Sequence, residues 1–241
     1  MSEPPQTPEP GLELFAPPPS AFTPEQTARC CAMVEKQFLA RGLRDPRVLA
    51  AMRAVPRHAF VPIGFADQAY DDQPLPIGEG QTISQPFMVA SMTAALELSG
   101  RERVLEIGAG SGYQTAVLSL LAHEVHAVES HPSLAESARV RLAQLGYRNV
   151  QIHVGDGTLG WADAAPFDAI LVTAAAPEIP EPLVAQLADG GRMVLPVGSA
   201  EMQHLLRVRR RDDMISTERF YQCRFVPLVG RYGWSDPSEF D

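Results

Sequence analysis

From residue 103 onward, short apolar runs alternate with stretches of helical character, and this alternation constrains the fold more than any other feature. Strands joined through helices form right-handed βαβ crossovers, which build a parallel sheet with helices on both faces. After residue 200, two apolar runs around a charged connection predict an antiparallel pair of strands at the sheet edge. The sequence thus predicts an α/β fold, doubly wound around a mostly parallel sheet with an antiparallel edge pair. The predicted strands are 103–107, 125–128, 150–154, 168–173, 192–196, 203–209 and 220–227, and the predicted helices are 112–122, 132–145 and 182–187.

The first hundred residues carry different signals. Residues 1–20 hold seven of the 22 prolines and no basic residue, so they are predicted to form a disordered tail. Thr23 before Pro24 is typical of a helix N-terminus, and a second short helix is predicted from Asp45 to Val55. We expect a single domain over residues 21–230, with a helical and loop-rich segment at 21–100 that includes a long loop at 57–86, and a C-terminal tail at 231–241.

Composition and charge exclude several classes of protein. The 241 residues are 45% hydrophobic, which is enough for one domain with a sizeable core. The formal net charge of −9 argues against a protein that wraps nucleic acid. Three cysteines provide neither a disulfide framework nor the spacing of a metal site, so no metal is expected. Without an 18-residue apolar run or a signal peptide, the chain is expected to be cytoplasmic and free of the membrane.

A glycine-rich segment follows the first predicted strand and opens the helix after it. Gly108, Ala109, Gly110 and Gly112 form this turn, where alternate glycines allow a sharp bend and a close approach of a ligand to the backbone. The spacing differs from the dinucleotide fingerprint, because the third glycine comes one residue early and Glu106 precedes the first. An acid there repels a pyrophosphate and attracts a cationic group such as an α-ammonium.

Two more acids follow the next predicted strands. Glu129 ends the second strand, where a carboxylate can accept both hydroxyls of a ribose, although acids are also common at solvated strand ends. Asp156 and Gly157 follow the third strand, at a place where an adenine edge can be met. Together with the glycine turn, these residues fit S-adenosylmethionine better than NAD.

The segment from Asp71 to Met92 reads DDQPLPIGEGQTISQPFMVASM, and it closely resembles the signature loop of the protein-L-isoaspartate O-methyltransferase family. Further fragments match this family in the expected order from about residue 24 to 230. They are MRAVPRHAFVP at 52–62, GAGSGYQ at 108–114, GDG at 155–157, APFD at 165–168, VTAA at 172–175 and RFVPL at 224–228. The resemblance implies a class I methyltransferase fold with S-adenosylmethionine as cofactor, and isoaspartyl-containing proteins and peptides as substrates.

The resemblance also assigns roles to the signature loop. It implies that Ser84 is the active-site serine and that Ile83, Gln85 and Pro86 lie against the cofactor. The hydroxyls of Thr82 and Ser84 are plausible donors to the reacting carboxylate. A carboxylate is already ionised at neutral pH, so it needs positioning and no general base. Ser84 can instead be an ordinary turn residue whose hydroxyl caps the following helix. The capping role and the active-site role can hold together.

Three alternatives remain open. The chain can be another methyltransferase on the same frame, acting on a different carboxylate or a small molecule, or a non-catalytic module that only binds S-adenosylmethionine. The segment 224–228 can be a wall of the peptide groove or a plain edge strand. The arginines at 207–211 precede Asp212 and Asp213, so a solvated turn is favoured over a nucleic-acid site. The sequence does not determine the oligomeric state, and a monomer is favoured.

Overall fold

The computed structural model describes residues 21–212 and 214–235. Seven strands form one sheet in the order β5-β4-β3-β6-β7-β8-β9, and β1 and β2 form a separate hairpin. The first five strands in this order run parallel, while β8 and β9 are antiparallel to their neighbours. The strands are β1 (Leu75–Gly78), β2 (Gln81–Ile83), β3 (Arg103–Ile107), β4 (Glu124–Glu129), β5 (Val150–Val154), β6 (Phe167–Val172), β7 (Leu187–Gly198), β8 (Gln203–Arg211) and β9 (Met214–Cys223).

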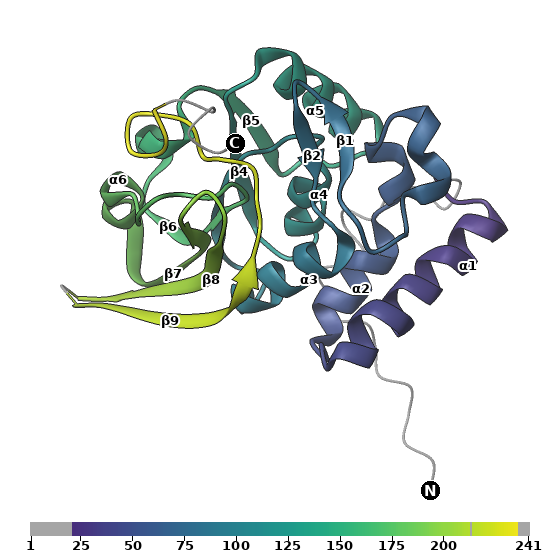
Figure 1. The fold of residues 1–241 in the computed structure, drawn as a ribbon, viewed down its shortest axis with the longest axis horizontal. Helices are drawn as coiled ribbons and strands as arrows, with labels where there is room; N and C mark the ends of the chain where they lie inside the picture. The colour runs from purple at the N-terminus through teal and green to yellow at the C-terminus, as the bar shows by residue number, and fades with distance from the viewer. Residues whose placement is uncertain (1–20, 213, 236–241) are drawn as a thin grey trace, which may run out of the picture.

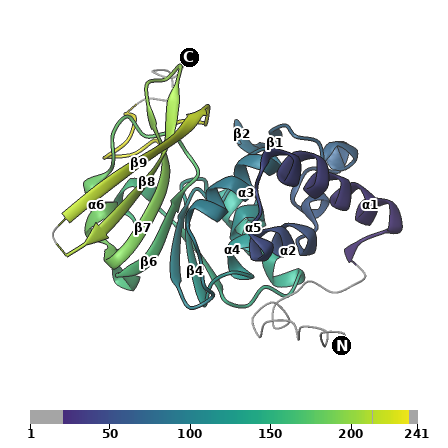
Figure 2. The same ribbon diagram turned by 90° about the horizontal axis from the view of Figure 1, so that it is seen from below.

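Helices cover both faces of this sheet, as the doubly wound prediction requires. Helices α1 to α5 lie on one side of it and α6 on the other (Figures 1 and 2). Their bounds are α1 (Pro24–Met33), α2 (Pro46–Ala54), α3 (Pro86–Ala95), α4 (Tyr113–Ser119), α5 (Pro132–Gln144) and α6 (Glu181–Ala185). In the part of the chain that the structure describes, no helix is long and apolar enough to cross a bilayer.

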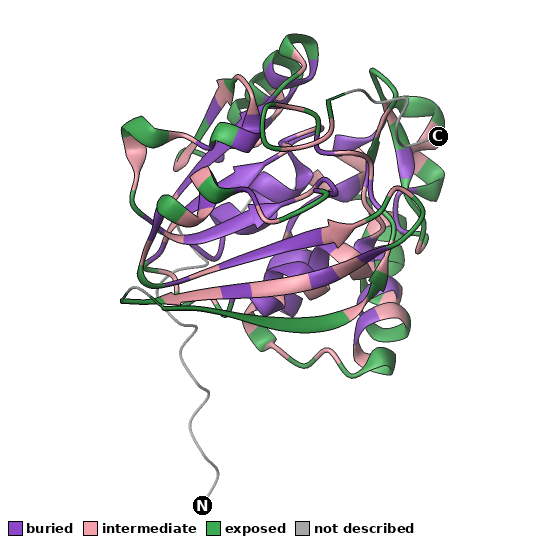
Figure 3. Cartoon of the chain, turned by 60° about the vertical axis from the view of Figure 1, so that its left-hand side comes forward, coloured by how far each residue is buried: buried purple, intermediate pink, exposed green. Residues whose placement is uncertain are grey.

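The sheet separates two apolar layers because successive side chains of a strand point to opposite faces. Leu105 and Ile107 of β3 pack with Leu183 of α6 on one face. Val104 of the same strand packs with Met92 of α3 on the other face. Figure 3 shows the parallel strands buried and β9 exposed along most of its length.

The helical N-terminal segment follows the local signals in the sequence. The Thr23 hydroxyl accepts from the Gln26 backbone N–H, and the Gln26 side chain accepts from the Thr23 N–H, which makes a capping box. The Asp45 carboxylate caps α2 by accepting from the Arg47 and Val48 backbone N–H groups. After α1 the chain continues through one π-helical turn, Val34–Phe38, and a short 3₁₀ turn, Leu39–Arg41.

Several predicted bounds are wrong, and they differ most where burial is weakest. The last strand is Met214–Cys223, whereas it was predicted over 220–227, because its first half is exposed and lacks an apolar pattern. The segment 57–86, predicted as a long loop, contains the 3₁₀ turns Arg57–Phe60 and Ile63–Gln68 and the β1–β2 hairpin. The predicted tail at 1–20 and the end of the predicted tail at 231–241 lie outside the described residues.

Candidate active site

Two adjoining cavities open at the carboxyl ends of the parallel strands. The larger has a volume of about 1120 Å³ and the smaller about 40 Å³. Both are lined by residues of the β1–β2 hairpin and by the turn after β3, and the larger is also lined by the end of β4 and by residues 222–229. Ligands of open α/β sheets bind at this edge, so the predicted site segments meet where the fold favours binding.

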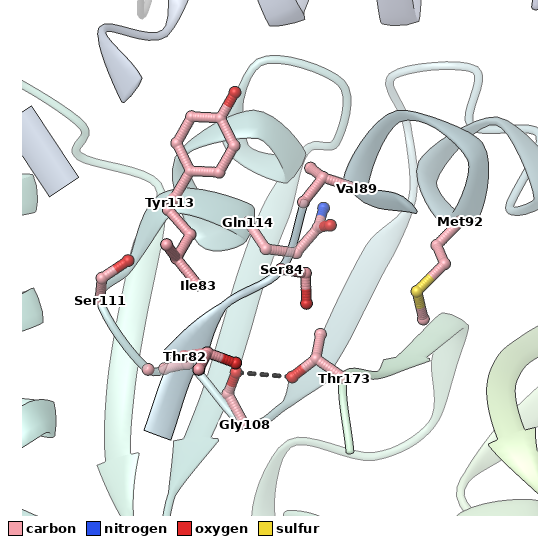
Figure 4. A pocket seen from close by; sticks show the side chains of 12 residues that line it. Thr82, Ile83, Ser84, Val89, Met92, Gly108, Ser111, Tyr113, Gln114 and Thr173 are labelled. Carbon is pink, nitrogen blue, oxygen red and sulfur yellow. Dashed lines mark hydrogen bonds between the residues drawn. The ribbon is translucent and has the colours of Figure 1, made fainter. Parts of the chain in front are cut away.

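The turn after β3 is held in a conformation that requires glycine. Gly108 has φ 92°, and an added Cβ would lie 2.5 Å from the hydroxyl oxygen of Thr173. That hydroxyl donates to the carbonyls of Ile107 at 2.9 Å and Gly108 at 2.8 Å, and Figure 4 shows the second of these bonds. Gly110 has φ 52° and lines both cavities. The backbone of the turn is therefore bare on the cavity side.

Glu129 lies at the end of β4, beside this turn. One oxygen of its carboxylate accepts from the Gly110 N–H at 2.8 Å, and the other accepts from the His131 N–H at 2.9 Å. The residue is only 5% exposed, and it lines the larger cavity. Two backbone donors fix the carboxylate, and its remaining lone pairs can still accept hydrogen bonds from a ligand.

The structure places Glu106 elsewhere than the sequence suggested. It is fully buried on β3, on the same face as Val104, and it lines neither cavity. Neither carboxylate oxygen has a hydrogen-bond partner among the described residues, and Thr115 of α4 is the polar side chain nearby. Burial raises the pKa of Glu106 to about 8. Glu106 thus lies outside both cavities, and its contact with an α-ammonium group stays a prediction.

The loop after β5 presents a glycine to the larger cavity. Gly157 lines it, whereas the Asp156 carboxylate lines neither cavity. Asp156 accepts from the Thr158 N–H at 2.9 Å and hydroxyl at 2.6 Å, and from the Arg231 N–H at 2.8 Å. An added Cβ at Gly157 would lie 2.5 Å from Ile107 Cγ2, so the loop packs tightly under the site. The Asp156 carboxylate thus joins this loop to the segment at Arg231, and its contact with an adenine stays a prediction.

The signature loop forms the wall opposite the glycine turn. Thr82 and Ser84 line both cavities, Ile83 lines the smaller, and Gln85 lines the larger. Figure 4 shows the Ser84 side chain pointing into the smaller cavity toward Thr173. The remaining predicted residues take different places: Ala109 lines the smaller cavity, while Pro86 begins α3 and Gly112 packs against α5, and neither of these two lines a cavity.

Residues 224–229 form a further wall of the larger cavity. This segment leaves β9 and runs beside Ala175, whose N–H donates to the Val226 carbonyl at 2.8 Å and whose carbonyl accepts from the Leu228 N–H at 2.7 Å. The Trp234 indole N–H donates to the same Ala175 carbonyl at 3.0 Å. This segment was predicted either as a wall of a groove or as a plain edge strand. It lines the larger cavity, so the structure agrees with a wall and not with a plain edge strand.

Sequence reasoning missed several residues of the site. Thr173 stabilises the glycine turn and lines both cavities, and Ser130 and His131 line the larger one. All three directly follow the carboxyl end of a parallel strand, which is the signal that could have found them. The described residues contain no group of three or more histidine, cysteine or acidic side chains that could hold a metal ion.

Comparisons with known proteins agree with this geometry. Residues 29–233 match the family model described as protein-L-isoaspartate (D-aspartate) O-methyltransferase. The protein-L-isoaspartate O-methyltransferase of Syntrophus aciditrophicus (strain SB) is 58% identical over 206 residues, covering 84% of this chain and 94% of the relative. The enzyme of that name from Geobacter metallireducens is 57% identical over 203 residues, with the same two shares covered.

Solved structures give the same answer. A protein-L-isoaspartate O-methyltransferase structure superposes with a TM-score of 0.74 at 27% identity, covering 86% of this chain and 67% of that one. A Plasmodium falciparum structure, described as a putative protein-L-isoaspartate O-methyltransferase in complex with S-adenosyl-L-homocysteine, has a TM-score of 0.73 at 25% identity, with 83% and 98% covered. Given these matches over most of its length, the chain belongs to the protein-L-isoaspartate O-methyltransferase family.

Proposed function

We propose that this protein transfers the methyl group of S-adenosylmethionine to the α-carboxylate of L-isoaspartyl residues in damaged proteins and peptides. The observation that carries the proposal is the position of the Ser84 loop, whose hydroxyls face the glycine turn across one cavity. The names of the relatives support the same activity. A module that only binds the cofactor would have no use for the Ser84 hydroxyl as a donor to a carboxylate.

The residues present fit S-adenosylmethionine. Gly108 and Gly110 leave the turn bare of side chains, and Glu129 holds a fixed carboxylate for the ribose hydroxyls beside it. The larger cavity, at about 1120 Å³, has room for the cofactor and part of a peptide. When bound, the cofactor supplies a methyl group on a positively charged sulfur, which makes that methyl electrophilic.

The protein's contribution to the reaction is mainly positioning. An isoaspartyl carboxylate is ionised at neutral pH, so it is a ready nucleophile without a general base. It must lie about 3 Å from the methyl group, in line with the departing sulfur. We propose that the hydroxyls of Thr82 and Ser84 hold one carboxylate oxygen and leave the other for attack. Because α3 begins at Pro86, its N-terminal end adds a favourable potential for an anion.

The wall at 224–229 suits an extended peptide. The backbone of Ala175 forms hydrogen bonds with the Val226 carbonyl and the Leu228 N–H, and these bonds fix the segment. Backbone recognition of this kind depends little on the side chains of a peptide. Damaged sites occur in many sequence contexts, and an enzyme that serves them needs such tolerance. The product ester is a better leaving group than the carboxylate and can cyclise to a succinimide, which hydrolyses partly to normal aspartate.

The test uses radiolabelled S-adenosylmethionine and two peptides that differ only in aspartate or isoaspartate at one position. We expect label on the isoaspartyl peptide alone, and we expect mild base to release it as methanol. Label that resists base would indicate a different methyl acceptor. Cofactor binding with no transfer to either peptide would favour another substrate or a non-catalytic role.

We further expect the protein to act as a monomer in the cytoplasm, without nucleic-acid or membrane partners. The net charge of −9 supports the exclusion of nucleic acid, because phosphate backbones attract basic surfaces. Light scattering of the purified protein measures its mass in solution, and a mass near 26.2 kDa is the expected result. A mass near twice this value would indicate a dimer and contradict the expected monomer.

A further inference from the structure

Arg57 is the largest fully buried side chain among the described residues, with 0% of its surface exposed. Its guanidinium donates from Nε to the Ala69 carbonyl at 2.7 Å and from Nη2 to the Ser84 carbonyl at 2.7 Å. It also lies over the Tyr113 ring, 4.7 Å from the ring centre. A cation is therefore anchored directly behind the residue that the proposed reaction uses to hold its acceptor.

No carboxylate of residues 21–212 and 214–235 forms an ion pair with this guanidinium. Asp72 acts on it from a distance, but its carboxylate pairs with Arg41 at 2.6 Å. The Nη1 atom of Arg57 has no hydrogen-bond partner in the described part of the chain. Burial lowers the pKa of Arg57, yet a guanidinium stays protonated in proteins. Burying an unpaired charge is costly, and a protein that retains one has a use for its field.

The bond to Ser84 also fixes the peptide unit that follows it. The Ser84–Gln85 peptide is trans, since the cis bond of the described chain is Ala165–Pro166. In a trans peptide the carbonyl and the N–H point in opposite directions. With the Ser84 carbonyl held by Arg57, the Gln85 N–H points away from the guanidinium. Both Ser84 and Gln85 line the larger cavity. That N–H makes no hydrogen bond to another described residue.

We propose that Arg57 is a positioning residue, which turns the Gln85 N–H toward the substrate carboxylate and supplies the positive field that selects an ionised acceptor. The inference rests on the proposed function, because it needs an anionic acceptor at Ser84. Arg57 itself touches neither cavity and acts through the Ser84–Gln85 peptide. The Gln85 N–H then joins the Ser84 hydroxyl as a donor to the carboxylate.

The experiment measures a preference that a merely structural role would leave unchanged. The two ligands are an isoaspartyl peptide and the same peptide with the α-carboxylate replaced by a neutral carboxamide. Their affinities are measured by calorimetry in the presence of S-adenosylhomocysteine, for the wild type and Arg57→Met. Arg192→Met is the matched control, because Arg192 is a largely buried arginine that holds the Leu96 and Glu97 carbonyls at the other end of α3.

We expect the wild type to favour the carboxylate peptide and Arg57→Met to lose about tenfold or more of this preference, the scale of a hydrogen bond to a charged group. Affinity for S-adenosylhomocysteine should stay within about threefold of the wild type, well under the tenfold that 1.4 kcal/mol represents. Arg192→Met should keep the preference even where it lowers stability. Equal weakening of both peptides in Arg57→Met, or an unchanged preference, would overturn the proposal.

A second variant separates charge from alignment. Arg57→Lys keeps the positive charge but cannot hold two carbonyls in the fixed fork of a guanidinium. It should retain most of the carboxylate preference while kcat falls about tenfold or more, because a donor is misplaced. Loss of the preference in Arg57→Lys, equal to that in Arg57→Met, would contradict the role of the charge.

If Arg57→Met does not fold, the wild type still decides the matter. Hydrogen exchange of the Gln85 amide should slow when the isoaspartyl peptide binds with S-adenosylhomocysteine, and unchanged exchange would overturn the proposal. A wild type that binds the cofactor product but neither binds nor methylates the isoaspartyl peptide would instead overturn the proposed function, and the role of Arg57 with it. Failure at Arg57 alone leaves wild-type methylation intact, so the two failures are distinguishable.

Discussion

The backbone N–H of Gly110 donates a hydrogen bond of 2.8 Å to the Glu129 carboxylate and so joins the turn after β3 to the end of β4. The turn was predicted as a place where a ligand comes close to the backbone. Glu129 was predicted separately, as an acceptor for the ribose hydroxyls. Their contact makes them one unit, because the carboxylate that we propose as the ribose acceptor also fixes the turn that we propose to lie against the cofactor. Changes at either residue should therefore weaken the same ligand.

Glu129→Gln should raise the Kd for S-adenosylhomocysteine about 10- to 100-fold, the scale of lost hydrogen bonds to a charged group. The amide oxygen can still accept, but the amide nitrogen faces a backbone N–H that it cannot satisfy. Calorimetry measures the change. Glu136→Gln is the control, since this exposed α5 acid pairs with Arg139 at the surface and with no other described residue. Wild-type affinity in Glu129→Gln would remove this residue from the cofactor site.

Gly110→Ala should lower cofactor affinity by at least about tenfold, equivalent to 1.4 kcal/mol. The new methyl group would lie 3.1 Å from Ile77 Cδ1, at a turn that lines both cavities. Gly146→Ala is a matched control, because Gly146 has φ 85° with nothing within 4 Å of the added Cβ. Both variants should lose about 1–2 kcal/mol of stability from the left-handed backbone, whereas only Gly110→Ala should lose S-adenosylhomocysteine in calorimetry. Equal affinities would show that the ligand does not approach this turn.

Ser84→Ala should lower kcat for the isoaspartyl peptide by about 10- to 1,000-fold, the range for the loss of one positioned donor. Its cofactor affinity should hardly change, because the hydroxyl faces the acceptor side. Ser137→Ala removes an exposed hydroxyl on α5 that, within the described part of the chain, donates to the Ser133 carbonyl alone, and it should leave kcat unaltered. Steady-state kinetics on both variants give the comparison. A Ser84→Ala enzyme with wild-type turnover would exclude this hydroxyl from the reaction.

Stability should fall with rising pH because of Glu106. Burial raises the pKa of this carboxyl from 4.5 to about 8 in the folded state. Between these values the folded protein holds a proton that the unfolded chain has released, so the free energy of unfolding decreases by up to about 1.4 kcal/mol per pH unit. The stabilising contribution of the neutral acid is complete below pH 4.5 and is lost through about pH 8.

Glu106→Gln should remove this decrease, because a carboxamide does not titrate. Urea unfolding at pH 5.5 and pH 7.5 measures the effect as the difference between wild type and variant, which cancels the other titrating groups. Glu136→Gln serves as the control for the loss of an acid at the surface. Parallel pH curves for wild type and Glu106→Gln would mean that the carboxyl is ionised in the folded protein.

Most strands of the sheet interior were predictable because they are apolar runs with clear ends. The bounds of β7 were wrong, since it spans Leu187–Gly198 and was predicted over 192–196. The predicted bounds of β3 and β5 agree with the structure, as does the order of strands and helices from residue 103. The start of β9 was not predictable, since Met214–Phe220 is exposed and is held as a strand by pairing with β8. Backbone pairing with a neighbour leaves no hydrophobic pattern in the sequence.

The sequence predicted which strand ends form the site. It predicted less well where the side chains at those ends point. Gly108 and Glu129 follow from position alone, because carboxyl ends of parallel strands meet at one edge. Glu106 is two residues from Val104, and the period of a strand puts both on the face that packs against α3, although Glu106 is close to the turn in sequence. The contact of Arg231 with Asp156 joins residues 75 positions apart, and no local sequence pattern in either segment predicts it.

The wall at 224–229 affects the order in which parts of the protein can fold during synthesis. Synthesis runs from the N-terminus, so the glycine turn and Glu129 can assemble while residues 224–231 are still within the ribosome. Ala175 bonds to Val226 and Leu228, and Asp156 bonds to Arg231, only after these later residues have emerged. A nascent chain can therefore assemble the glycine turn and Glu129 before the larger cavity has its wall at 224–229.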